Sequence, residues 1–255
     1  MISNYMIVCF LINIMIGLGI PIGSFFYLIR KRDKCIKPYF IGVLVFLISQ
    51  IFLRIPLINN VLAYMEWFNY MTIFYPIAYI LFLGFSAGIF EEIGRYLGFK
   101  IALKNNRRWI DGISFGLGHG GIEAVLFLGI PSIQNLFTAI SLNNGTHLEG
   151  NIESIRALYL SMSNINVLMG SVERILAIIM HVGLTLIVLY GINKKQIRYL
   201  LLAILIHGSA NSISVICLNF GMNVLIVEGI IGIFSLGLLI FIIKSKELFK
   251  KFEGV

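Results

Sequence analysis

The sequence predicts an all-α, polytopic membrane protein folded as one helical bundle. Of its 255 residues, 58% are hydrophobic and only 13% are charged, and the mean hydropathy is +0.92. A soluble domain of this length needs a more polar composition, and the apolar runs are long enough to cross a bilayer. We therefore expect a single integral-membrane domain over residues 1–255, a multi-pass protein of a bacterial plasma membrane that contacts lipid.

Seven apolar runs predict about seven transmembrane helices. The runs cover about 5–29, 39–58, 70–99, 109–129, 165–190, 199–217 and 222–243. The first lacks the basic stretch of a signal peptide and is expected to be retained. The fourth is expected to end at Gly129-Ile130-Pro131, because proline interrupts helices. A polar outer region from 132 to about 164 should follow, with Asn143-Asn144-Gly145 as a turn signal and short helices in places.

The basic residues predict the orientation of the bundle. Of the 20 lysines and arginines, 16 fall in alternate links and in the tail: Arg30, Lys31, Arg32, Lys34, Lys37, Lys100, Lys104, Arg107, Arg108, Lys194, Lys195, Arg198, Lys244, Lys246, Lys250 and Lys251. The opposite links hold only Arg156. Cytoplasmic loops carry the lysine and arginine excess, so we expect the N-terminus outside and the C-terminus in the cytoplasm. The same clustering argues that the net charge of +8 does not indicate a nucleic-acid partner.

Ionisable residues inside the apolar runs predict one buried site. Glu91 and Glu92 lie near the end of the third run, and His119, His181 and His207 lie in the next three. A charged side chain in a membrane helix costs about 2.5–3.5 kcal/mol and usually marks function. Counted from the cytoplasmic ends at 1.5 Å per residue, all five lie roughly 10–15 Å deep. Four helices are therefore expected to bring these groups into one layer.

The spacing of neighbouring residues refines this layer. Arg95 is one helical turn from the glutamate pair and can balance the charge of one carboxylate. Phe115, His119 and Glu123 share one helix face, as do His207 and Asn211. The run Gly116-Leu117-Gly118-His119-Gly120-Gly121 removes side chains around the histidine and permits close helix approach.

These groups predict hydrolysis by an activated water. A glutamate beside a histidine can take a proton from water, and an amide donor such as Asn211 can stabilise an oxyanion. No serine or cysteine stands in a recognisable nucleophile context. The motif HExxH is absent, so a zinc site would be assembled from His119, His181 and His207, with or without a glutamate. The sequence favours no cofactor but permits Zn²⁺.

Three motifs in order resemble a known superfamily. The series Glu91-Glu92-x-x-Arg95, Phe115-x-x-x-His119 and His207-x-x-x-Asn211 is similar to that of the CPBP (CAAX-processing and bacteriocin-processing) glutamic-type intramembrane proteases. The run GxGHGGxE and the extra His181 suggest its YhfC-like bacterial branch. The resemblance covers about residues 85–215, which we expect to be the catalytic core.

The resemblance implies roles for single residues. Glu91 would activate water with help from His119, while His207 and Asn211 would form the oxyanion site. Glu92 and Arg95 would support the base. The superfamily usually has three residues between the second glutamate and the arginine, whereas this chain has two, Ile93 and Gly94. His181 is as well suited to a packing role as to a catalytic one.

The sequence thus favours an endopeptidase that cuts a peptide or membrane-protein substrate near the cytoplasmic face. A zinc-dependent metalloprotease and a proton-coupled transporter are the alternatives. Transporters typically show repeat symmetry, and no internal repeat is apparent. A scaffold would have no use for the polar layer. Glu123, Glu173 and Arg174 are expected to form a buried structural charge network and not to act chemically, and His147 is expected to be solvated.

Overall fold

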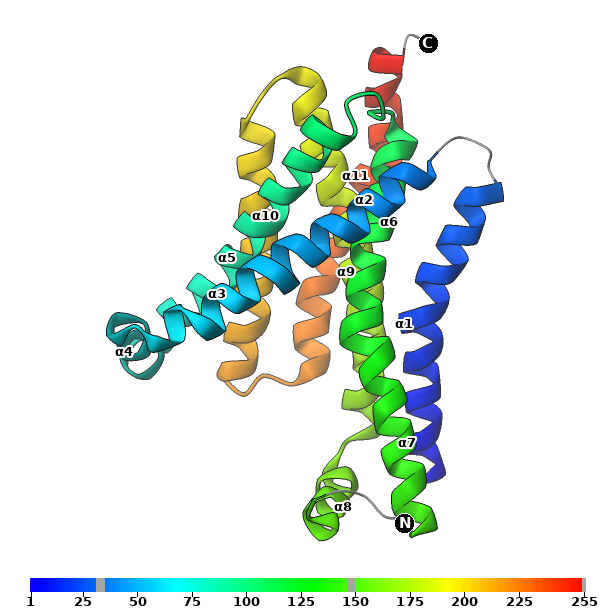
Figure 1. The fold of residues 1–255 in the computed structure, drawn as a ribbon, viewed down its shortest axis with the longest axis vertical. Helices are drawn as coiled ribbons and strands as arrows, with labels where there is room; N and C mark the ends of the chain where they lie inside the picture. Colours follow the sequence, from blue (N-terminus) through cyan, green and yellow to red (C-terminus); the bar gives the residue numbers. More distant parts are fainter. Residues whose placement is uncertain (31–34, 146–149, 254–255) are drawn as a thin grey trace.

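The structure is a computed structural model that describes residues 1–30, 35–145 and 150–253 (Figure 1). Seven helical stretches in these residues are long and apolar enough to cross a membrane: 4–30, 36–64, 76–102, 109–144, 164–194, 198–219 and 224–252. The predicted seven-span, all-α fold is confirmed. The side of the membrane on which each terminus lies stays a prediction. His147, Lys31, Arg32 and Lys34 lie outside the described residues.

Three of the seven spans, 36–64, 76–102 and 109–144, are built from consecutive helical segments, and each of the three includes a wider, π-helical turn. In chain order the helical segments are α1 (Asn4–Arg30), α2 (Ile36–Phe46), η1 (Leu47–Arg54), α3 (Ile55–Asn60), η2 (Leu62–Tyr64), α4 (Glu66–Phe74), α5 (Pro76–Leu97), η3 (Gly98–Ala102), α6 (Trp109–Ala124), η4 (Val125–Gly129), α7 (Ile130–Asn144), α8 (Ile152–Ser161), α9 (Asn164–Lys194), α10 (Arg198–Asn219) and α11 (Val224–Glu253).

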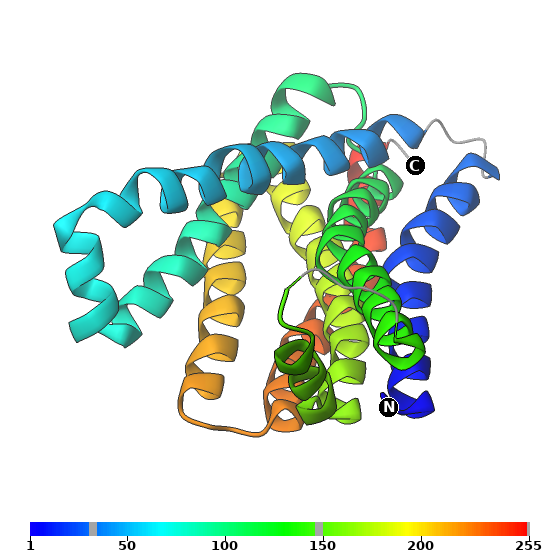
Figure 2. The same ribbon diagram turned by 60° about the horizontal axis from the view of Figure 1, so that its bottom comes forward.

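Helix α9 is the centre of the bundle. It contacts α1, α5, α6, α10 and α11, and it is the most buried of the seven spans. The α2–α3 segment and α5 splay away from this core and are joined at their far end by α4 (Figures 1 and 2). The ends that carry the basic clusters lie together at the top of Figure 1, and the N-terminus lies at the bottom.

The predicted helix over 70–99 is wrong at its beginning. The chain breaks at Tyr75, whose φ of −133° and ψ of 61° separate α4 from α5. The following residue is Pro76, and a proline disfavours helical geometry in the residue before it. Pro76 itself suits the first turn of α5, where its missing N–H is not needed. The glutamate pair therefore lies on a helix that begins at this break.

The predicted end of the fourth helix at Gly129 is also wrong. Helix α6 continues through η4 into α7, and the helix ends only at Gly145, whose φ is +69°. In the wide turn, the amide of Ile130 donates to the carbonyl of Val125, five residues back. This turn precedes Pro131, which then occupies the first turn of α7 and lacks an N–H to donate. The predicted turn at 143–145 is confirmed as the end of α7.

Glycines let two helices approach α6 at backbone distance. A Cβ atom at Gly118 would overlap the carbonyl oxygen of Tyr39 in α2. A Cβ at Gly116 would lie 2.5 Å from the Cα of Val182 in α9. The close approach predicted from the glycine run is confirmed, and it fixes the position of His119 between these helices.

Replacing Gly118 by alanine is expected to destabilise the fold. The added methyl group meets backbone atoms, which cannot move aside as a side chain does, and such overpacking costs about 1–3 kcal/mol. Denaturant unfolding in detergent measures the loss. Gly237→Ala is the matched control, because a Cβ there meets nothing within 4 Å. Equal stability of the two variants would contradict the packing described.

Candidate active site

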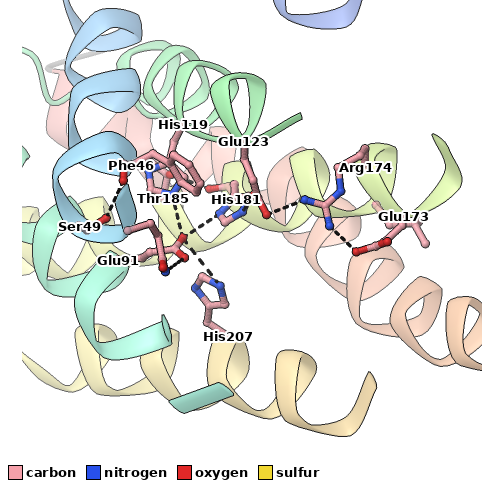
Figure 3. A network of polar contacts seen from close by, with 12 residues as sticks. Phe46, Ser49, Glu91, His119, Glu123, Glu173, Arg174, His181, Thr185 and His207 are labelled. Atoms are coloured by element: carbon pink, nitrogen blue, oxygen red, sulfur yellow. Dashed lines mark hydrogen bonds and ion pairs between the residues drawn. The ribbon is translucent and has the colours of Figure 1, made fainter. Parts of the chain in front are cut away.

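Glu91 of α5 is the centre of a buried cluster of histidines (Figure 3). Its Oε2 lies 2.9 Å from Nε2 of His119 in α6. The same oxygen lies 3.9 Å from Nδ1 of His181 in α9 and 3.9 Å from Nε2 of His207 in α10. Only 4% of the surface of Glu91 is exposed. Four helices therefore place one carboxylate and three imidazoles in direct proximity.

The other oxygen of Glu91 is bound from the second span. Gln50, in η1, donates a hydrogen bond from Nε2 to Oε1 of Glu91. Arg54 in turn donates from Nη1 to Oε1 of Gln50 at 3.0 Å and from Nε to Ser86 Oγ at 2.9 Å. No role was predicted for Gln50 and Arg54 from the sequence. The sequence feature that could have indicated a role is an amide and a guanidinium four residues apart in an apolar run.

Glu92 is held by a different set of partners. Arg95 donates from Nη1 to Oε1 of Glu92, which is an i, i+3 ion pair within α5. His207 Nδ1 lies 2.8 Å from the same oxygen. Glu92 and Arg95 are completely buried. The two-residue spacing before Arg95 thus directs the arginine to Glu92, one helical turn away.

His181 joins this cluster to a second polar network. Its Nε2 lies 2.5 Å from Oε2 of Glu123, and Arg174 donates from Nη1 to Oε1 of Glu123 at 2.6 Å. Arg174 also binds Glu173, whose side chain is 48% exposed. Figure 3 shows the series of polar contacts that leads from Glu91 to Glu173. The predicted charge network of Glu123, Glu173 and Arg174 is present, and His181 connects it to the cluster around Glu91.

Aromatic rings enclose the imidazole of His119. Phe46 lies edge-on at 5.2 Å between ring centroids, and Phe115 is stacked at 6.2 Å. The ring of His181 lies 4.7 Å away on another side. His119 has no exposed surface. These contacts exclude water from the back of the cluster and fix the imidazole toward Glu91.

A cavity of about 260 Å³ opens onto the front of the cluster. Glu91, His181, His207 and Asn211 line it, whereas Glu92, Arg95 and His119 lie behind that wall. Asn211 is one turn beyond His207 on α10 and presents its amide to the cavity outside the hydrogen-bonded cluster. All seven residues singled out from the sequence are therefore in or beside one site.

Three of these side chains could hold a metal ion. Glu91, His119 and His181 each offer a donor atom, and the three atoms lie within 4.8 Å of one another. The sequence favoured no metal but permitted a zinc site of His119, His181 and His207, with or without a glutamate. In the structure the compact group consists of Glu91, His119 and His181, and His207 is not part of it.

Comparisons with known proteins show the family to which the chain belongs. A family profile described as "YhfC intramembrane metalloprotease" matches residues 15–231. The chain belongs to the YhfC family. It is 31% identical over 263 residues to the "Uncharacterized membrane protein YhfC" of Bacillus subtilis (strain 168), with 98% of this chain and 100% of that protein covered. No solved structure matches.

Membership of the YhfC family bears on several predictions. The YhfC-like branch, the multi-pass location in the cell membrane and the class of intramembrane protease-like hydrolase are confirmed at this level. The family description names a metalloprotease, so the preference for a metal-free, glutamic-type mechanism is not supported. The wider CPBP placement stays a prediction.

Proposed function

We propose that this YhfC-family protein is a metal-dependent intramembrane peptidase that hydrolyses a peptide bond at the Glu91 cluster. The observation that carries the proposal is the compact donor group of Glu91, His119 and His181 at the wall of a cavity. His207 and Asn211 line the same cavity and supply groups for proton transfer and for oxyanion binding. The substrate class is a peptide or a membrane protein.

The donor set fits a catalytic zinc ion. Two histidines and a glutamate are an established catalytic set that leaves a position open. Glu123 binds the far nitrogen of His181, and such carboxylate partners usually orient metal-binding histidines. When bound, Zn²⁺ supplies a Lewis acid for the scissile carbonyl and an activated water. All three donor residues are buried, so their orientation is fixed by packing.

His207 is suited to move the proton. Its Nδ1 faces Glu92, which fixes an N–H at that atom and leaves the lone pair of Nε2 toward Glu91 and the cavity. An imidazole held in this way can accept a proton from water at Nε2 and return it to the leaving amine. Arg95 keeps the carboxylate of Glu92 charged and in place.

Asn211 is suited to bind the carbonyl oxygen of the substrate. Its amide lies one turn from His207 in the cavity wall. A donor aimed at the developing oxyanion typically contributes on the order of 10²–10³ in rate. The position of this layer, near the predicted cytoplasmic side, supports cleavage in that half of the membrane.

One contact favours a metal-free form of the same reaction. Arg95 Nη2 lies 3.2 Å from Nδ1 of His181, the nitrogen that a metal would require. Without a metal, Glu91 would take the proton from water with help from His119, as the CPBP resemblance implies. In both versions Glu91 is essential. The protease description of the family favours either version over the transporter alternative.

Metal analysis separates the two versions. We expect the protein, purified in detergent without chelator, to contain about one zinc ion per chain. His119→Ala should lower the zinc content at least about tenfold, because it removes one of three ligands. Plasma mass spectrometry measures the metal, and Glu247→Gln at an exposed site in the tail is the control. Less than about 0.1 zinc per wild-type chain would favour the glutamic version.

A further inference from the structure

The cavity at the cluster extends along one face of α10. His207, Asn211, Ser214 and Leu218 all line it, at steps of three or four residues that bring them to the same side of the helix. The lining also includes Val224, the first residue of α11. The cavity therefore runs from Glu91 toward the α10–α11 link, which lies on the side away from the basic clusters (Figure 1).

The outer part of this cavity holds an excess of carboxylates. Glu123, Glu173 and Glu228 line it, and Arg174 is the one lysine or arginine among the described lining residues. Arg174 is bound to both Glu123 and Glu173. One guanidinium therefore serves two of the three carboxylates, and it forms no ion pair with Glu228.

Glu228 is the cavity carboxylate with an unsatisfied oxygen. Its Oε2 is buried and forms no hydrogen bond with any described residue. It lies on α11 one turn beyond Val224, between the link and the cluster. Burying a carboxylate oxygen without a partner is costly, and a cation in the cavity would offset that cost.

We propose that a peptide substrate enters this cavity from the α10–α11 side and places a lysine or arginine side chain against Glu228. Glu228 is then a specificity-determining residue. This inference rests on the proposed function, because the molecule that occupies the cavity is the peptide substrate. It adds a direction of entry and a preference for a basic residue on the segment that leads to the cleaved bond.

The residues that line the cavity indicate the side of the membrane from which the substrate enters. The basic ends of the helices, which we expect in the cytoplasm, lie opposite the α10–α11 link. Substrate would therefore approach from the outer side, although the reacting groups lie in the predicted cytoplasmic half. A chain segment in this route passes Glu228 and Ser214 before it reaches Asn211 and His207.

Charged thiol reagents test both parts of the proposal. The reporter protein carries Cys217→Ala and Ser214→Cys in the full chain, in right-side-out membrane vesicles; Cys9 and Cys35 are buried. The probes are a cationic and an anionic methanethiosulfonate of similar size, applied from outside. We expect the cationic reagent to modify the introduced thiol roughly tenfold faster, after correction for a free thiol in solution, which corresponds to about 1.4 kcal/mol.

Glu228→Gln should remove most of this preference, whereas Glu247→Gln in the tail should leave it unchanged. A short peptide amide with one lysine should slow modification of the introduced thiol more than its glutamate analogue does, and Glu228→Gln should abolish that difference. Absence of modification from outside would overturn the entry route. An unchanged rate ratio in Glu228→Gln would overturn the role of Glu228. Neither zinc nor hydrolysis is measured, so these failures are distinct from failure of the proposed function.

Discussion

Replacing Glu91 by glutamine is expected to abolish peptide hydrolysis while the bundle remains folded. Glu91 contacts His119 directly and lies beside His181 and His207, so every proposed step depends on its carboxylate. Loss of the general base or of a metal ligand should lower the rate at least roughly 10³-fold. Glutamine keeps the size of the side chain and can still pair with Gln50. Mass spectrometry of peptides released from membranes that contain the protein measures the effect.

Glu247→Gln is the matched control for this substitution. The side chain of Glu247 is 70% exposed and pairs with Lys250 near the end of α11. The control should release the same peptides as the wild type at the same rate. Unfolding in detergent should show equal stability for all three proteins within about 1 kcal/mol. Undiminished peptide release by the Glu91→Gln protein would refute the role given to Glu91.

Replacing Arg95 by methionine is expected to cause the largest loss of stability. Arg95 is completely buried and neutralises Glu92, which is also completely buried. Breaking a buried pair by removing one partner typically costs about 3–5 kcal/mol, because the other charge is left uncompensated. Unfolding in detergent measures the change. Activity should fall as well, since His207 depends on Glu92 for its orientation.

A double substitution shows whether the cost arises from the ion pair. Glu92→Gln combined with Arg95→Met removes both charges of the ion pair together, so neither partner leaves an uncompensated charge behind. We expect the double variant to be more stable than Arg95→Met alone, with a coupling of about 1–3 kcal/mol. Additive losses would mean that Arg95 stabilises the bundle through packing and not through Glu92.

Apolar run length was sufficient to predict the spans, but not their breaks. The seven helices follow from runs that only a bilayer accommodates, and six of them begin within a few residues of their predicted positions. The two errors both concern prolines. Pro76 ends a helix through its effect on Tyr75, whereas Pro131 is accepted within a helix after a wide turn. Both positions hold a proline near an apolar run, so the residue type alone does not tell a helix break from a continued helix.

Depth was sufficient to bring together the residues of the site, but not to assign their contacts. Counting from the helix ends placed Glu91, His119 and His207 in one layer, and the structure joins them there. Depth does not fix the rotation of a helix about its axis. For that reason the sequence did not reveal that Gln50 faces Glu91 or that Glu123 reaches His181.

The most direct test of the central claim is a titration of one purified sample with zinc, with peptide release measured at each step. The substrate is a membrane preparation without active enzyme, and the readout is the set of peptides that wild type releases and Glu91→Gln does not. We predict that removal of metal stops release and that activity returns in proportion to bound zinc up to one ion per chain. Full release from wild-type protein that holds no metal would contradict a metal site at Glu91, His119 and His181.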